Sequence, residues 1–122
     1  MIAGKNKIPF VNENLKMHDA LKILRHKNLG FIIVRNSKKI TTGILTDGDL
    51  KRKIKKNQKL HNLLVKKVMT PNPVSISQDM LATKALSIMQ DKKITALCVN
   101  SNKSKYKTTG VLHIHNILRA NI

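Results

Sequence analysis

The chain has 122 residues, and its 24 lysine and arginine residues against six aspartate and glutamate residues give a formal net charge of +18 at pH 7. No apolar run approaches the roughly twenty residues that cross a bilayer, so the composition excludes a membrane-spanning helix and predicts a soluble protein. The first residues lack the apolar core of a signal peptide, and the single cysteine, Cys98, fits a buried small hydrophobe. Together these features predict a cytoplasmic location.

The basic charge raises the question of nucleic-acid binding. Base stacking needs aromatic rings, yet the chain has one tyrosine, two phenylalanines and no tryptophan. No zinc-ligand or helix-turn-helix pattern accompanies the lysines. We therefore rank specific nucleic-acid binding below a solvated basic face and below attraction to acidic partners or a phosphorylated ligand.

In the first half of the chain the period of the apolar residues changes in a fixed order. It predicts an extended piece, a helix, a buried strand and a second strand, in turn at residues 8–11, 15–24, 31–34 and 40–45. A second helix follows, with Asp47 or Asp49 as the residue that caps it. The predicted order is strand, helix, strand, strand, helix.

The second half of the chain repeats the first. TTGILTDGDL at residues 41–50 matches TTGVLHIHNI at residues 108–117, and further matches lie upstream of both. One unit of roughly sixty residues is marginally stable alone. We therefore expect an α+β fold of two tandem repeats, residues 4–65 and 66–122, packed sheet to sheet with pseudo-twofold symmetry. Prolines predict an extended joint at about residues 66–73, and the cleft between the repeats is the expected ligand site.

Candidate site residues gather where the second strand of the first repeat ends and its second helix begins. Asp47 and Asp49 could cap that helix. A carboxylate there could also accept hydrogen bonds from vicinal sugar hydroxyls, while Thr46 and the helix N-terminus hold a phosphate. The two interpretations coexist if one aspartate caps and the other binds. The chain has no nucleophile paired with a base, no Walker loop and no GxGxxG motif, so we expect no catalysis by it.

The motif GILTDGD at residues 43–49 resembles the signature of CBS domains, and the duplicated unit resembles a tandem CBS pair, or Bateman module. Segments 44–52, 68–73, 93–97 and 110–120 closely resemble the C-terminal part of the arabinose 5-phosphate isomerases. In that family a sugar isomerase (SIS) domain converts ribulose 5-phosphate to arabinose 5-phosphate for Kdo and lipopolysaccharide biosynthesis. We expect that SIS domain to be absent from this chain, which then has no catalytic residues of its own.

The resemblance also implies positions for a bound ligand. In CBS modules the motif aspartate binds ribose hydroxyls and the motif threonine helps to hold phosphate, which correspond to Asp49 and Thr46. The second repeat has His113 at the threonine position and Asn116 at the aspartate position, so its grip on a diol is weaker. The remaining expected ligand-binding positions, by analogy with other CBS pairs or by their place at the corner, are Ile8, Val74, Thr95, Ala96 and His115.

Two functions follow from the resemblance. The first is a regulatory CBS pair that senses an adenine nucleotide or a nucleotide sugar such as CMP-Kdo, with no required cofactor. The second is a structural oligomerisation module without a tight ligand. In either case the resemblance implies a homo-oligomer, a dimer of the CBS pair and a tetramer with the SIS domain. The histidine pair His113 and His115 could bind metal, but no cysteine or carboxylate at suitable spacing completes a site, and we predict none.

Overall fold

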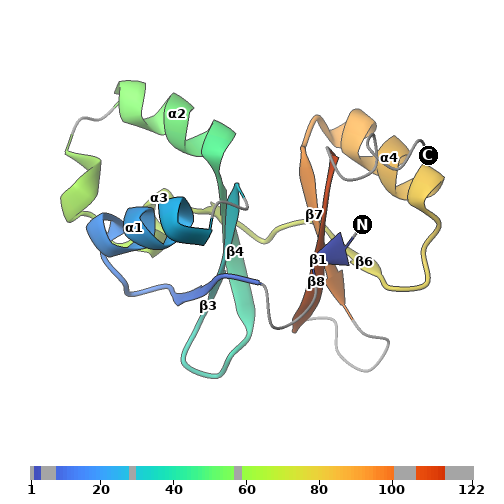
Figure 1. The fold of residues 1–122 in the computed structure, drawn as a ribbon, viewed down its shortest axis with the longest axis horizontal. Helices are drawn as coiled ribbons and strands as arrows, with labels where there is room; N and C mark the ends of the chain where they lie inside the picture. The colour runs from blue at the N-terminus through green and yellow to red at the C-terminus, as the bar shows by residue number, and fades with distance from the viewer. Residues whose placement is uncertain (1, 4–7, 28–29, 57–58, 101–106, 115–122) are drawn as a thin grey trace. The chain divides into compact units, whose positions relative to one another are not determined.

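The computed structural model describes residues 2–3, 8–27, 30–56, 59–100 and 107–114. The chain divides into two compact units. We call Pro9–Pro73 the first unit, and Met1–Ile8 together with Val74–Ile122 the second unit. Each unit combines helices with a four-stranded sheet (Figure 1), which confirms the predicted α+β class. Among the described helices, none has both the length and the apolar character needed to span a membrane.

The first unit follows the predicted order of strand, helix, strand, strand, helix. Its sheet has the strand order β2-β3-β4-β5, in which only the β2–β3 pair is parallel. The predicted elements are confirmed, with ends that differ by no more than three residues. The elements of the unit are β2 (Phe10–Asn12), α1 (Met17–Lys27), β3 (Phe31–Arg35), β4 (Thr41–Thr46), α2 (Asp47–Lys56), the 3-10 helix η2 (Leu60–Asn62), α3 (Val65–Val68) and β5 (Thr70–Pro71).

The second unit repeats this arrangement. Its sheet has the order β1-β8-β7-β6, with β6 and β7 parallel and the other pairs antiparallel. Ile114 is helical and marks the start of the last predicted helix, whose remaining residues lie outside the described part of the chain. The elements are β1 (Ile2–Ala3), β6 (Ser75–Ser77), α4 (Ala82–Lys92), β7 (Ala96–Asn100) and β8 (Thr108–His113).

The strand pairing confirms the repeat residue by residue. Phe31 lies opposite Thr46 in the first unit, and Ala96 lies opposite His113 in the second. Each hairpin also has a shift in its pairing register near the end of its first strand. The shift follows Val34 in the first unit and Val99 in the second. Because a bulge shifts the pairing register, its recurrence at matching positions shows that the two halves share one backbone plan.

The segment 66–73 differs from the predicted extended joint. Residues 66–68 belong to the short helix α3, and the prolines act only after it. The chain then adds β5 to the edge of the first sheet, where Pro71 pairs with Gly43 and Thr70 with Ile44. Proline has no backbone N–H to donate. It is tolerated on an edge strand because no strand on the outer side needs that hydrogen bond. The segment is therefore part of the first unit and not only a joint.

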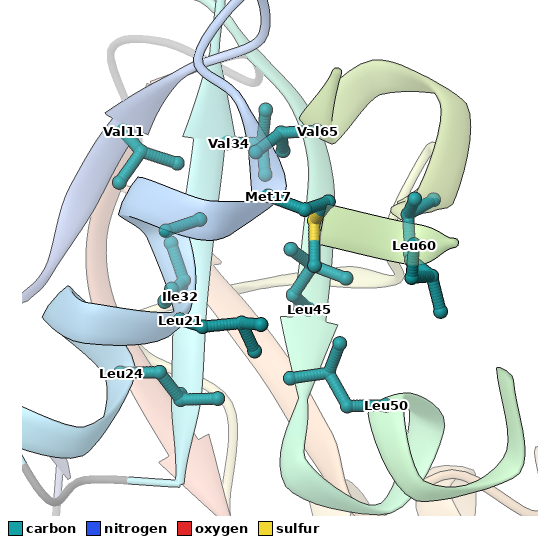
Figure 2. Packing of buried hydrophobic residues seen from close by; sticks show 12 residues of the cluster. Val11, Met17, Leu21, Leu24, Ile32, Val34, Leu45, Leu50, Leu60 and Val65 are labelled. Atoms are coloured by element: carbon teal, nitrogen blue, oxygen red, sulfur yellow. The ribbon is translucent and has the colours of Figure 1, made fainter. Parts of the chain in front are cut away.

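The core of the first unit lies between the sheet and its helices (Figure 2). Helical spacing places Met17, Leu21 and Leu24 on one face of α1, and they meet Ile32 and Val34, which alternate along β3. Each fully buried aliphatic side chain contributes roughly 1.5–3 kcal/mol relative to exposure. The remaining buried members of the cluster are Val11, Ala20, Leu45, Leu50, Leu60, Val65 and Val68.

Backbone hydrogen bonds hold α3 against the start of α1. The Met17 N–H donates to the Leu63 carbonyl at 2.8 Å, and the Val65 N–H donates to the Leu15 carbonyl at 2.7 Å. These bonds join residues that lie almost fifty positions apart in the chain. They anchor the segment from which β5 emerges, so the position of β5 beside β4 depends on tertiary contacts.

Candidate functional site

The first candidate site is the corner between β4 and α2. The hydroxyl Oγ1 of Thr46, the last residue of β4, accepts a hydrogen bond from the backbone N–H of Asp49 at 3.1 Å. Thr46 therefore caps α2, and the prediction that Asp47 or Asp49 caps it is wrong. Only the residue just before a helix places its side chain within reach of the N–H three positions on. Both aspartates lie inside the first turn, where negative charge meets the positive end of the helix dipole.

The carboxylate of Asp49 accepts hydrogen bonds from two side chains. Arg52, one turn further along α2, donates from Nη2 to Oδ1. Thr70 of β5 donates from Oγ1 to Oδ2 at 3.3 Å. The Asp49 side chain keeps 19% of its exposure and the Arg52 side chain 72%. The carboxylate is thus held in place from two directions, by two residues that are both exposed.

Thr70 reaches this corner because β5 passes close over Gly43. A Cβ on Gly43 would overlap the side chain of Met69 and would lie 3.0 Å from the Thr70 carbonyl oxygen. The glycine of the motif therefore permits β5 to pair with β4. Neither Thr70 nor Arg52 was predicted as a site residue, because Thr70 falls in the predicted joint and Arg52 is one of many basic residues. The spacing of three between Asp49 and Arg52 on a helix was the available signal.

Gly30 completes the backbone of the corner. Its carbonyl accepts the Asp47 N–H at 3.0 Å. Gly30 has a φ of 80°, and a Cβ at this position would lie 3.5 Å from Oδ2 of the exposed Asp47. Since side chains are strained at such a φ, glycine suits this turn. The backbone of Gly30 thus lies beside the carboxylate of Asp47, at the N-terminus of α2.

The second unit has the same corner with other side chains. His113 ends β8, is half-buried, and lies opposite the buried Ala96 of β7. The Ile114 N–H donates to the Thr95 carbonyl at 2.8 Å, which repeats the bond between Asp47 and Gly30. Sequence analysis placed Thr95, Ala96 and His113 together, and the structure brings them together. His115 and Asn116 lie outside the described residues.

Ile8 and Val74, two of the expected ligand-binding positions, do not occupy equivalent positions in the two repeats. The Val74 carbonyl accepts the Cys98 N–H at 3.0 Å, and in the first unit the matching acceptor for Ile33 is Pro9, also at 3.0 Å. Ile8 lies one residue earlier, is 7% exposed and groups with the second unit. Val74 is half-buried and belongs to the same unit.

Cys98 is a packing residue of β7. It is fully buried, and burial raises the pKa of its thiol from 9.0 to about 11, although a hydrogen bond with the Thr108 side chain acts in the opposite direction. A thiol with such a pKa holds almost no thiolate at neutral pH and is a poor nucleophile. Across the residues that the structure describes, no three histidine, cysteine or acidic side chains are grouped as metal ligands would be.

The first corner brings together groups that donate and accept hydrogen bonds. A fixed carboxylate accepts hydrogen bonds from hydroxyl groups, and a helix N-terminus attracts anions. The neighbouring side chains Arg52 and Thr70 are hydrogen-bond donors, and neither is a base or a nucleophile at neutral pH. This combination fits a ligand that carries both a diol and a negative charge.

The CBS domain family model matches residues 5–56 and 65–122, so the chain belongs to the CBS domain family, with two copies in tandem. Its sequence is similar to that of the arabinose 5-phosphate isomerase KdsD from Salmonella typhi, with 35% identity over 117 residues. The KdsD from Escherichia coli K12 is 34% identical over the same length. In both cases the match covers 96% of this chain, which spans only about a third (35%) of the isomerase.

Solved structures confirm the fold. A CBS-domain containing protein, ATU1752 from Agrobacterium tumefaciens, matches with a TM-score of 0.84 at 19% identity, covering 94% of this chain and 84% of the other. The CBS-pair protein CBSX2 from Arabidopsis thaliana matches with a TM-score of 0.79 at 22% identity, covering 98% and 89%. A structure of CBSX2 in complex with AMP matches with a TM-score of 0.81 at 23% identity, covering 98% and 91%.

Proposed function

We propose that the chain is a regulatory CBS pair of an arabinose 5-phosphate isomerase, and that it binds a nucleotide or nucleotide sugar at the motif corner of the first unit. The similarity to KdsD over nearly the whole chain supports the association with this isomerase. The chain itself does no catalysis in this proposal. The isomerase reaction, from ribulose 5-phosphate to arabinose 5-phosphate, is carried by residues outside it.

The geometry of Thr46 and Asp49 is the observation that carries the proposal. Thr46 locks the first turn of α2 through its bond to the Asp49 N–H, so the carboxylate is held beside the helix N-terminus. A ribose would donate its two vicinal hydroxyls to Asp49, and its phosphate would lie toward the N-terminus of α2. In the second unit a histidine, His113, stands in place of Thr46, so we expect the first unit to dominate binding.

The ligand class is proposed from two sources. CBSX2 has been solved with AMP and the CBS pair of MJ0100 with 5'-methylthioadenosine and S-adenosylmethionine, and these molecules share an adenosine. The pathway of the isomerase suggests instead its CMP-linked end product, CMP-Kdo. Both classes present a ribose diol with a substituent at the 5' position. We propose an adenine nucleotide or CMP-Kdo as the regulatory ligand, and no required cofactor.

The test is a thermal-shift and calorimetric titration of the chain with AMP, ATP, CMP, CMP-Kdo and arabinose 5-phosphate. A ligand at a hundred times its Kd stabilises the folded state by about 2.7 kcal/mol, which raises Tm by several degrees. Asp49→Ala is expected to abolish the shift. Asn116→Ala, the same truncation at the matching position of the second repeat, is expected to leave most of it.

Two results would contradict the proposal. One is the absence of any shift at millimolar ligand. The other is a shift that survives in Asp49→Ala and is lost in Asn116→Ala, which would place the ligand at the second motif. Circular dichroism of both variants checks that the truncations leave the fold intact.

A second candidate function is oligomerisation without a tight ligand. It is favoured by the contacts of Asp49, because Arg52 and Thr70 already supply a donor to each carboxylate oxygen. It is also favoured by Leu81, an aliphatic side chain that is 73% exposed. Sedimentation of Leu81→Ser tests this candidate. A dimer that dissociates in the variant, with no ligand shift in the parent chain, would support oligomerisation as the function.

A further inference from the structure

Arg52 forms an ion pair with the carboxylate of Asp49, to which the proposed ligand would bind. It donates to Oδ1 of Asp49, while Thr70 donates to Oδ2. A ribose diol would donate to those same two oxygens, which together have about four lone-pair sites. A ligand must therefore displace Arg52 or share the carboxylate with it.

The two partners differ in exposure, and we expect Arg52 to move. The Asp49 side chain is 19% exposed and is held by Thr70, whereas Arg52 is 72% exposed. An exposed pair at positions i and i+3 is weak, so its rupture costs little. The Arg52 guanidinium also leans back over the first turn of α2, since a Cβ on Gly48 would lie 3.8 Å from its Nη1. The arginine thus stands beside the helix N-terminus.

These contacts have opposite consequences for two kinds of ligand. A neutral nucleoside that takes Asp49 leaves the guanidinium of Arg52 without its carboxylate. A nucleotide gives the guanidinium a new acceptor, because its phosphate lies at the same helix end and binds arginine in a strong charged pair. The displaced side chain then contributes to binding.

We propose that Arg52 is the specificity-determining residue of this site. It competes with neutral ribosides for Asp49 and selects ribosides that carry a phosphate. This inference rests on the proposed function, because it assumes that the diol binds at Asp49. It adds a regulatory consequence: the chain distinguishes a nucleotide from its dephosphorylated product.

The experiment measures Kd by calorimetry for two matched pairs, adenosine with AMP and cytidine with CMP. The parent chain is compared with Arg52→Ala. Removing the competing donor is expected to tighten nucleoside binding by about threefold. Losing the phosphate partner is expected to weaken nucleotide binding by about fivefold or more. The ratio of nucleoside Kd to nucleotide Kd should therefore fall by at least about tenfold.

Lys55→Ala is the matched control. Lys55 lies three residues further along α2, is exposed, and its loss removes the same single charge. Because Lys55 is exposed, solvent and salt screen its charge, and we expect only a small change in either ratio. Arg52→Gln keeps a polar side chain, which is shorter than that of arginine and has no charge. It serves as a second variant and is expected to behave like Arg52→Ala.

The outcomes separate the two claims. If the parent chain binds a nucleotide and the ratio falls equally in Lys55→Ala and Arg52→Ala, the role of Arg52 is overturned and the proposed function stands. If nucleoside binding weakens in Arg52→Ala, competition for Asp49 is also overturned. If neither the parent chain nor any variant binds a member of the two pairs, the proposed function itself fails, and the inference with it.

Discussion

The two motif corners of this chain share a backbone and differ in chemistry. In the first unit the N–H after the last strand residue bonds to the carbonyl of Gly30, and in the second unit it bonds to that of Thr95. The hydroxyls of Thr42 and Thr109 both donate to a carbonyl of the neighbouring strand, at 3.5 and 3.2 Å. The side chains that could touch a ligand do not match, since Thr46 corresponds to His113.

This difference teaches that duplication preserves what the backbone requires. Strand pairing, bulges and turn hydrogen bonds recur because each repeat must satisfy its own main-chain groups. Ligand contacts are free to diverge between the copies, because folding does not need both. The comparison between the repeats can be tested by changing matched residues, beginning with the core.

The largest effect is expected from truncating the core at matched positions. Leu45 is fully buried, and Leu112, its counterpart 67 residues later, is 6% exposed. The cluster around Leu45 has twelve buried members, and the described part of the cluster around Leu112 has six. We expect Leu45→Ala to lower the free energy of unfolding by about 3–5 kcal/mol and Leu112→Ala by about 2–3 kcal/mol. Urea denaturation measures both, and a larger loss at Leu112 would contradict the ranking.

The next effect distinguishes the repeats by pH. Cys98 of the second unit corresponds to Ile33 of the first, and the pKa of its thiol is raised to about 11 by burial. Between pH 9 and 11 the unfolded chain loses the thiol proton and the folded chain keeps it. The contribution of this thiol to the free energy of unfolding is therefore fully present below pH 9. Between pH 9 and 11 the free energy of unfolding should fall by about 1.4 kcal/mol per pH unit.

The control for this pH dependence is Cys98→Ala, which has no thiol. Lysine titration is common to both proteins and cancels in the difference between their stabilities. The difference should change with pH only in the alkaline window. A thiol that reacts with DTNB in the native protein at pH 8 as fast as in the unfolded one would contradict the burial of Cys98.

A smaller loss is expected where β5 crosses β4. Gly43→Ala places a Cβ against the side chain of Met69 and 3.0 Å from the Thr70 carbonyl oxygen, so the Met69 side chain must move and the start of β5 is crowded. We expect a loss of about 1–3 kcal/mol in the free energy of unfolding. Part of it should return in the double variant Gly43→Ala/Met69→Ala, because the flexible side chain is then absent. Strictly additive losses would show that Met69 does not transmit the clash.

The smallest effect is expected from removing the helix cap Thr46, which the first corner has and the second replaces with His113. Thr46→Ala removes the acceptor for the Asp49 N–H and should cost about 1 kcal/mol, whereas Thr46→Ser should cost much less. Thermal denaturation of the two variants measures the difference. Equal losses in both would show that the methyl group of Thr46, and not its hydroxyl, stabilises the corner.

The sequence predicted much of this architecture because its signals are local. Apolar periodicity located the main helices and strands of the described residues, though not β1, η2, α3 or β5. The repeated TTG segments aligned the two hairpins in the register that the structure has. The same signals misplaced the cap, because a threonine and two aspartates are all good capping residues. Only the position of the helix start at Asp47 decides among them.

The candidate site was predicted in part for the same reason. Thr46 and Asp49 belong to one short motif, and their spacing is legible in the sequence. Arg52 was read as part of the basic face, since its side-chain direction depends on the turn of α2. Thr70 could not be predicted at all from local patterns, because it reaches Asp49 across 21 positions of the chain.

The duplication and the order of elements in each repeat follow from the spacing and periodicity of the sequence, and the motif residues follow from its resemblance to CBS domains. Tertiary structure alone decided that the segment after α3 becomes an edge strand. It does so because Gly43 has no Cβ and the backbone bonds of Met17 and Val65 anchor that segment. It also decided which donors surround Asp49, because a hydrogen bond between distant residues exists only once packing has brought them together.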